Sequence, residues 1–258
     1  MLWALLLEYD GGPFAGWQRQ TNGLSEQEVL ESAAARLNGG QPCPTVVAGR
    51  TDAGVHAAGQ VAQIALPDRL DALRIRDALN FHLKPHPVVV LDASPAPEGW
   101  NARFSATGRA YRYRILNRRA RPALACGRVW HVPHPLDAQA MHAAAQTLLG
   151  RHDFTSFRAA GCQASGPLRT LDRLAVTRDG ALVEITAEAR SFLHHQVRNI
   201  AGTLKLVGEG AWPVARVASA LQARDRAAAG PTAPPEGLCL EAVRYPAPLF
   251  PSMGASAC

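Results

Sequence analysis

Residues 45–66, TVVAGRTDAGVHAAGQVAQIAL, consist of two apolar segments joined by a glycine-containing loop. Thr45 to Ala48 predicts a short strand, and Gln60 to Leu66 predicts a second one. Glycines 49 and 54 allow a tight backbone path between the two strands. Because loops on a rigid scaffold often carry functional side chains, this loop is the first place to look for chemistry.

The segments on either side of this unit complete a βαββαβ order. Before it, residues 3–9 predict a strand, and the capping box Ser25–Glu28 begins a helix of regular apolar period. After it, Asp68 is expected to cap a helix that runs to about Asn80. Residues 88–91 then predict a buried strand.

The second half repeats this order. Arg109 to Leu116 alternates as a strand, with Tyr111 and Tyr113 on one face and Arg112 and Arg114 on the other. The elements expected after it are a helix capped by Asp137, a hairpin around Asp179-Gly180, two helices and a closing strand over residues 238–245.

Two successive βαββαβ units predict an α+β fold. Each unit corresponds to a ferredoxin-like, RRM-like module with an antiparallel sheet, and two such sheets could join around a central catalytic cleft. The expected division is an N-terminal module over residues 1–105 and a C-terminal module over residues 106–258. Four-stranded sheets of this kind often bind RNA.

Composition indicates a globular protein of a reducing compartment. The hydrophobic fraction of 47% is enough for a sizeable core. No apolar run approaches the roughly 18 residues of a membrane helix, and the N-terminus lacks the basic region of a signal peptide. The cysteines at positions 43, 126, 162, 239 and 258 include no Cys-x-x-Cys pair, so we expect packing roles in a cytoplasmic protein rather than disulfides or zinc.

The net charge of +6 is unevenly distributed and favours a polyanionic partner. Between Glu98 and Asp137 there is no acidic residue, whereas arginines stand at positions 103, 109, 112, 114, 118, 119, 121 and 128. A general preference for arginine over lysine explains the residue type but not the missing carboxylates. The stretch predicts a nucleic-acid footprint, with Arg112 and Arg114 as candidates for contact with an RNA backbone.

Asp52 is the candidate catalytic residue of the loop 49–54. A short acidic side chain between glycines can be held out from a scaffold, and Arg50 favours its ionised form, as a nucleophile requires. On residue types alone, an aspartate in such a loop is more often an Asx-turn residue. A phosphate-binding loop fits less well, because no Gly-Lys-Ser/Thr and no helix start follow.

Several motifs in one order resemble a single enzyme family. Residues 48–62 are similar to the signature of the TruA family of tRNA pseudouridine synthases. Further similar segments are residues 8–11, 16–20, 102–106, 111–113, 153–158, 192–200 and 236–238. Many separate motifs in the same order are far more specific than any one of them.

The resemblance implies a pseudouridine synthase fold and a homodimeric enzyme that uses neither cofactor nor metal. Its expected substrate is tRNA, with the uridines at positions 38, 39 and 40 of the anticodon stem-loop as targets. By the family motifs, Asp52 is the nucleophile and Tyr111 lies against the target base. Arg198 pairs with the aspartate, Arg50 helps to displace the target nucleotide, and Leu238 lines the base pocket.

These roles suit the reaction physically. Taking a base out of an RNA stem costs a few kcal/mol, which an arginine in the vacated space and a stacking tyrosine offset. Whether Asp52 attacks the sugar, attacks the base or removes a proton from the ribose stays open. For the adjacent His194 and His195 we expect a structural or RNA-backbone role, since no further ligands at metal spacing accompany them.

Two alternatives follow from the same residues. The first is a pseudouridine synthase that acts on other RNA positions. The second is a non-catalytic RNA-binding protein, against which the intact set Asp52, Tyr111 and Arg198 argues.

Overall fold

The computed structural model describes residues 1–162 and 164–250, and the chain divides into two compact units. The first unit comprises Met1–Thr107 together with the segment from Leu240 onward, and the second comprises Gly108–Cys239. The division expected from the sequence left that C-terminal segment in the second module. It belongs with the first because the Thr107 backbone N–H donates to the Arg244 carbonyl (2.8 Å) and the Tyr245 hydroxyl donates to the Ala102 carbonyl (2.7 Å).

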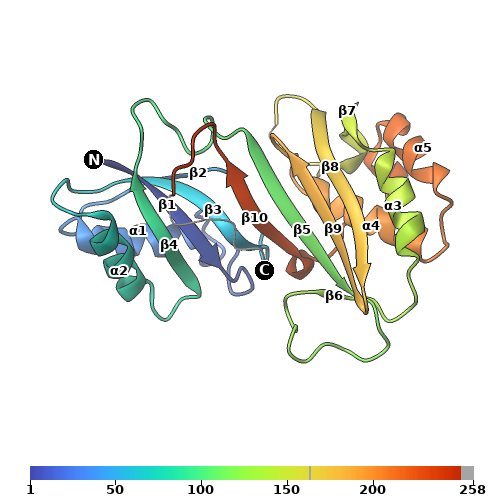
Figure 1. The fold of residues 1–258 in the computed structure, drawn as a ribbon, viewed down its shortest axis with the longest axis horizontal. Coiled ribbons are helices and arrows are strands. Elements are labelled where there is room, and N and C mark those ends of the chain that lie inside the picture. The colour runs from blue at the N-terminus through green and yellow to red at the C-terminus, as the bar shows by residue number, and fades with distance from the viewer. Residues whose placement is uncertain (163, 251–258) are drawn as a thin grey trace. The chain divides into compact units, whose positions relative to one another are not determined.

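The first unit has the predicted βαββαβ order (Figure 1). Its elements are β1 (Leu2–Tyr9), α1 (Glu26–Leu37), β2 (Thr45–Val47), β3 (His56–Ala65), α2 (Ala72–Leu83) and β4 (Val88–Pro95). The strands pair antiparallel in the order β4-β1-β3, and β2 also pairs with β3. Strand β10 (Leu238–Arg244) lies next to β3.

Local signals explain where the helices of this unit begin. The Ser25 side chain accepts from the Glu28 N–H (3.1 Å), which confirms the predicted cap of α1. The cap of α2 is Asp71 rather than Asp68, and its side chain accepts from the Arg74 N–H (2.8 Å). Residues 68 and 69 form a turn after β3, so Asp68 instead contacts the N-terminal amino group.

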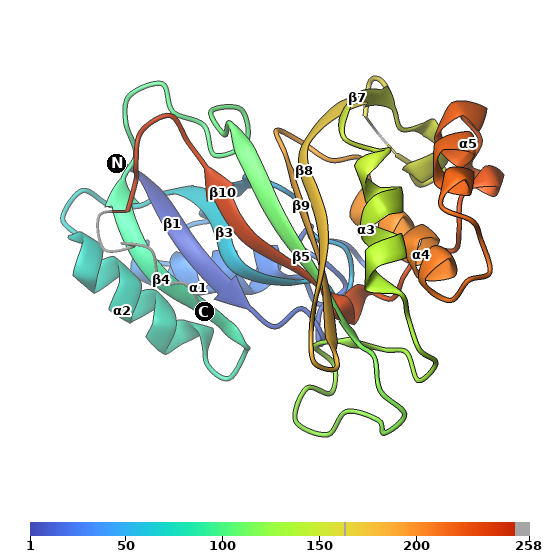
Figure 2. The same ribbon diagram turned by 45° about the vertical axis from the view of Figure 1, so that its right-hand side comes forward.

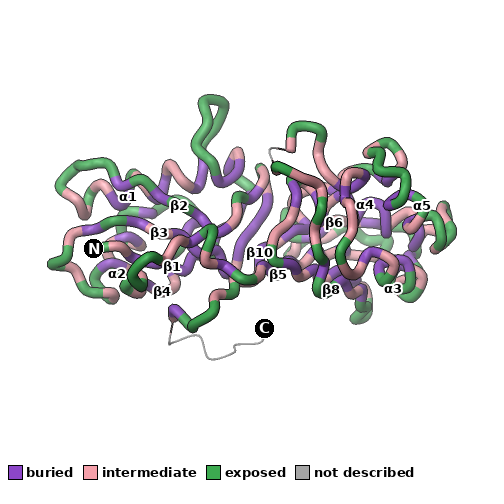
Figure 3. Tube along the Cα trace, turned by 90° about the horizontal axis from the view of Figure 1, so that it is seen from above, coloured by how far each residue is buried: buried purple, intermediate pink, exposed green. Residues whose placement is uncertain are grey.

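Strand β1 is buried on both faces, which is why its sequence reads as a continuous hydrophobic run. Helices α1 and α2 cover one side of the sheet, where Leu30 and Leu79 are fully buried. On the other side, Leu6 belongs to a hydrophobic cluster against which Trp100 and Tyr245 pack. Strands β1 and β3 are mainly buried, whereas most residues of β8 (Leu168–Asp179) are exposed or intermediate; Figure 3 shows the burial along the chain.

The second unit is also mixed and mostly antiparallel (Figure 2). Its elements before β10 are β5 (Gly108–Leu116), β6 (Trp130–His131), α3 (Ala138–Gln146), β7 (Gly150–Asp153), β8 (Leu168–Asp179), β9 (Leu182–Ala189), α4 (Gln196–Gly208) and α5 (Ala215–Ala223). The strand order is β5-β9-β8-β7, and β6 pairs parallel with β5. The sequence did not predict β6 and β7, because two and four residues of mixed polarity carry no periodic signal.

The two faces of β5 differ as predicted. Tyr113 and Ile115 are fully buried, and they lie opposite Ile185 and Val183 of β9. Helices α3 and α4 pack on this side of the sheet (Figure 2). Arg112 and Arg114 are half-buried and lie on the opposite face, so the alternation reports the orientation of the strand correctly.

None of the helices among the described residues combines the length and apolar character needed to cross a membrane. The four described cysteines are free thiols. The predicted packing role fits Cys43, which is buried, but not Cys126, which is exposed. Cys258 lies outside the described residues.

Candidate active site

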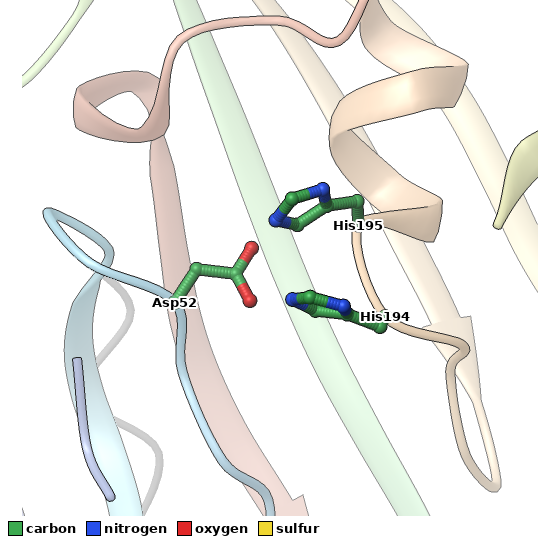
Figure 4. A group of neighbouring side chains, drawn as sticks. All are labelled: Asp52, His194 and His195. Atoms are coloured by element: carbon green, nitrogen blue, oxygen red, sulfur yellow. The ribbon is translucent and has the colours of Figure 1, made fainter. Parts of the chain in front are cut away.

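Asp52 lies in the loop between β2 and β3, as predicted, and its side chain extends from the loop (Figure 4). The backbone of this residue is held from two directions. Asp52 forms an antiparallel bridge with Gly16, and its carbonyl accepts from the Val55 N–H (3.1 Å) in a tight turn. The Trp17 N–H donates to the Thr51 carbonyl (3.1 Å). The aspartate therefore sits on a fixed backbone rather than on a free loop.

Gly16 permits this close approach of two backbone segments. Its φ is +103°, a region that side-chain-bearing residues rarely adopt. A Cβ at this position would lie 3.0 Å from the Ala53 nitrogen and the Thr51 carbonyl oxygen. The sequence segment 16–20 and the loop 49–54, which both belong to the family resemblance, are thus neighbours in the fold.

A buried polar network of hydrogen bonds also holds the loop 49–54. The Tyr9 hydroxyl lies 2.8 Å from the Thr51 Oγ1. Gln60, which is fully buried, donates from Nε2 to the Gly49 carbonyl (2.7 Å) and to the Tyr9 hydroxyl oxygen (3.2 Å). Buried polar side chains rigidify their surroundings when their hydrogen bonds are satisfied. Residues on β1 and β3 therefore fix the residues on either side of Asp52.

One further contact lies near the loop, and one charged side chain of the loop is exposed. The Gly11 N–H donates to Nδ1 of His56 (3.1 Å), which joins the end of β1 to the start of β3. Arg50 is exposed on the loop itself, two residues before Asp52. The position of Arg50 leaves its guanidinium accessible to a ligand.

In the second unit, Tyr111 is buried on β5 opposite Ala187 of β9. Its ring meets the ring of Phe192 edge to face, with the centroids 5.2 Å apart and the planes at 88°. Such aromatic pairs add about 0.5–1.5 kcal/mol beyond the area that they bury. The strand and Phe192 together fix the plane of the tyrosine ring.

Arg198 extends from the first turns of α4. Its Nε donates to the Ala233 carbonyl (2.9 Å), and the Ala233 N–H donates back to the Arg198 carbonyl (3.1 Å). Because Nε is used in this way, the orientation of the guanidinium plane is defined. The half-buried Arg198 side chain is therefore held in one orientation.

The segment 230–237 is fastened to α4 and β5 and leads into Leu238. A Cβ on Gly202 of α4 would lie 1.8 Å from the Pro231 carbonyl oxygen, so only glycine allows this approach. Tyr113 donates from its hydroxyl to the Pro234 carbonyl (2.8 Å). Burial, followed by the nearby Glu236 carboxylate, raises the pKa of the Tyr113 hydroxyl, which therefore stays a donor. Leu238 is buried at the start of β10.

Asn199 is a buried residue that sequence reasoning did not single out. Its Nδ2 donates to the Phe157 carbonyl (2.8 Å), and its Oδ1 accepts from the Thr232 hydroxyl (2.7 Å) and from Arg226 (3.1 Å). Asn199 and the preceding Arg198 therefore both contact the segment 230–237. The place of Asn199 in the matched run 192–200 was the available signal.

His194 and His195 precede α4, and their rings lie side by side with centroids 4.0 Å apart and planes at 42° (Figure 4). His195 has a left-handed backbone, with φ +62°, which is uncommon for a residue with a side chain. Its carbonyl accepts from the Asn199 N–H (2.8 Å) at the start of the helix. The expected structural or RNA-backbone role of the pair stays a prediction.

Arg112 and Arg114 share one carboxylate. Glu184 of β9 lies directly opposite Arg114, and its Oε1 is 3.2 Å from Arg114 Nε and 3.5 Å from Arg112 Nη1. All three side chains are half-buried. The two candidates for RNA-backbone contact are therefore partly neutralised by a residue 70 positions along the chain from Arg114.

Comparison with known proteins relates the chain to one group of enzymes. A family model described as tRNA pseudouridine synthase matches residues 144–246. The tRNA pseudouridine synthase A of Acidiphilium cryptum is 73% identical over 250 residues, which cover 96% of this chain and 98% of that protein. The proteins of the same name from Gluconobacter oxydans and Rhodospirillum centenum are 58% identical over 246 residues and 61% over 237 residues. These alignments cover 95% and 92% of this chain, and 90% and 96% of the two relatives.

Proposed function

Because this chain belongs to the tRNA pseudouridine synthase A family, we propose that it isomerises the uridines at positions 38, 39 and 40 of the tRNA anticodon stem-loop, with Asp52 as the nucleophile. Family membership makes the chain an isomerase that converts uridine to pseudouridine in tRNA. The observation that carries the role of Asp52 is its fixed loop, held through Gly16, Tyr9 and Gln60.

The reaction balances without an oxidant or a reductant. The bond between N1 of uracil and C1′ of the ribose breaks, and a bond between C5 and C1′ forms. The hydrogen on C5 leaves as a proton, and N1 gains one. The residues must therefore hold the nucleotide, assist cleavage of the glycosidic bond and keep the detached base in place while it turns.

Asp52 supplies a carboxylate for this cleavage, and a rigid backbone suits that role. A catalytic group that is held in place avoids the entropic cost of being positioned during the reaction. By the family motif, Arg198 is the basic residue that pairs with the aspartate during the reaction. The hydrogen bond from Arg198 Nε to Ala233 supports this role, because it orients the guanidinium.

The target base is bound by three further residues, Tyr111, Arg50 and Leu238. Stacking of a base on an aromatic ring is worth about 1–3 kcal/mol, which is comparable to the cost of taking a base out of a stem. The contact with Phe192 holds the Tyr111 ring in one plane for that purpose. Arg50, exposed on the catalytic loop, takes the place of the displaced nucleotide, and the buried Leu238 contributes apolar lining.

We infer further that each unit is a ferredoxin-like module and that residues of both act on the same uridine. The element order of the first unit and its antiparallel pairing support this reading. Action as a cytoplasmic homodimer without a cofactor is proposed from the family resemblance.

Mapping of pseudouridine in bulk tRNA tests the proposal. Cells that lack the gene are compared with cells that carry the wild-type gene, Asp52→Asn or the control Asp77→Asn, which changes an exposed acid of α2. We expect pseudouridine to disappear at positions 38 to 40 alone and to return with the wild type and the control but not with Asp52→Asn. Loss at other positions supports the alternative RNA targets, and no loss at all supports a non-catalytic RNA-binding protein.

A further inference from the structure

The connection between β5 and β6, residues 117–129, is an exposed loop that extends beyond the ends of both strands (Figures 1 and 2). It contains no acidic residue, and four arginines stand at positions 118, 119, 121 and 128. All four are exposed. The loop therefore carries four positive charges on the surface of the second unit.

The ends of this loop are closed by the fold. Strand β6 pairs parallel with the end of β5, so that Leu116 lies beside His131. The Asn117 side chain donates to the carbonyls of Val132 (2.9 Å) and His134 (2.6 Å) and accepts from Arg178 (2.8 Å). Loops with joined ends are compact and frequently functional. Much of the entropy of ordering this loop is thus lost when the unit folds, not when a ligand binds.

The charges of Arg119 and Arg121 differ from those of Arg112 and Arg114, which share the Glu184 carboxylate. The Arg118 guanidinium donates to two backbone carbonyls, those of Ala120 (3.1 Å) and Arg121 (3.4 Å), and so shapes the loop. Arg119 and Arg121 form no ion pair with any residue that the structure describes. Within the basic stretch, Arg119 and Arg121 are therefore exposed charges without a paired carboxylate among the described residues, unlike Arg112 and Arg114.

We propose that this loop binds the phosphate backbone of the tRNA at a distance from the reacting uridine; the inference rests on the proposed function. Arginine is the preferred side chain for phosphate because its planar fork donates two parallel hydrogen bonds. Leu116 lies five positions after Tyr111 on the strand, which corresponds to roughly 17 Å. The loop therefore lies beyond the reach of the nucleotide that stacks on Tyr111.

The composition of the loop favours RNA over a membrane surface. Leu124 is its one large apolar side chain that is fully exposed. Binding at a membrane interface scales with buried apolar area, and a single leucine supplies little of it. Backbone binding to RNA needs only the charges.

The test compares two pairs of arginines in the full-length protein. The loop variant is Arg119→Gln/Arg121→Gln, and the control is Arg74→Gln/Arg76→Gln on α2, which lowers the net charge by the same amount. Binding of full-length tRNA is measured over a series of salt concentrations, and kcat and KM are measured by tritium release from tRNA labelled at C5 of uridine. Each phosphate contact contributes about 1 to the slope of log Kd against log salt concentration. We therefore expect this slope to be smaller by about 2 in the loop variant than in the wild type.

The loop variant is further expected to raise KM and to leave kcat unchanged, because the loop does not touch the reacting atoms. The conservative pair Arg119→Lys/Arg121→Lys keeps the salt slope if charge is what matters, and thermal melting verifies that all variants fold. A slope that stays at the wild-type value, or that falls equally in the control, overturns the inference. A second result also overturns the inference, in favour of a membrane contact. In that case the wild type floats with phosphatidylserine vesicles and the loop variant does not, while the salt slope of tRNA binding is the same in both. If pseudouridine forms at other tRNA positions while the slope still falls, the proposed target is wrong and the loop assignment stands.

Discussion

The Tyr9 hydroxyl lies 2.8 Å from the Thr51 Oγ1, and Thr51 is the residue directly before Asp52. Both side chains are buried, so the hydrogen bond is shielded from water. It connects the end of β1 to the candidate nucleophile loop across 42 positions of sequence.

Tyr9→Phe removes this hydrogen bond and the one that the hydroxyl accepts from Gln60. We expect turnover to fall roughly ten- to a hundred-fold, because a small displacement of a catalytic group costs that much. The matched control is Tyr245→Phe, which also deletes one hydroxyl hydrogen bond, to Ala102, in the same unit. Single-turnover kinetics measure the effect, and an equal loss in both variants contradicts a specific role for Tyr9.

Asp52→Asn is expected to abolish pseudouridine formation and to leave tRNA affinity nearly unchanged. The amide occupies the same volume but cannot act as a nucleophile or a base. Tritium release measures turnover, and filter binding measures affinity. Wild-type turnover in this variant would falsify the nucleophile assignment, and Asp77→Asn serves as the control.

Arg112→Gln/Arg114→Gln is expected to weaken tRNA binding and to flatten its salt dependence, but less than the change in the β5–β6 loop does. The reason is that Glu184 already neutralises part of the charge of this pair. By the same argument, Glu184→Gln should tighten binding at low salt. Fluorescence anisotropy with labelled tRNA measures both effects, and an unaltered slope means that this face does not meet the backbone.

Glu26 makes stability depend on pH. This residue of α1 is fully buried, and its two carboxylate oxygens have no hydrogen-bond partner elsewhere in the described residues. Burial raises the pKa of Glu26 from 4.5 to about 7. Between these values the folded chain holds a proton that the unfolded chain releases, so stability falls as the pH rises from about 4.5 to about 7.

The size of this loss is on the order of 3 kcal/mol, reached above about pH 7. Glu26→Gln should remove this part of the pH dependence, whereas Glu28→Gln in the same turn should keep it. Urea unfolding at about pH 5 and about pH 8 measures the difference. A wild-type stability that rises over this interval, with no change in the Gln variant, refutes the assignment.

Periodic patterns predicted the element order well, whereas short and distant features escaped them. Helices α1 and α4 have clear apolar periods, and β5 alternates cleanly. The choice between Asp68 and Asp71 as the cap of α2 depends on how tightly the chain turns after β3, which no local pattern encodes.

The candidate site shows the same limit. Asp52, Tyr111 and Arg198 came from motifs, and the structure adds the residues that hold them. Gln60 reaches Tyr9 across 51 positions, and Glu184 reaches Arg114 across 70. Neither residue type suggests its partner, because such pairings depend on strand register.

The return of the C-terminal segment to the first unit has a consequence for synthesis of the protein. Residues 1–107 leave the ribosome before the second unit, whereas strand β10, which lies next to β3, follows nearly all of that unit. Between these two events the ribosome makes nearly the whole second unit. The part of the β3 edge that β2 does not pair with therefore stays unpaired until the second unit has been made, and the unit that carries Asp52 is completed only after the unit that carries Tyr111 and Arg198.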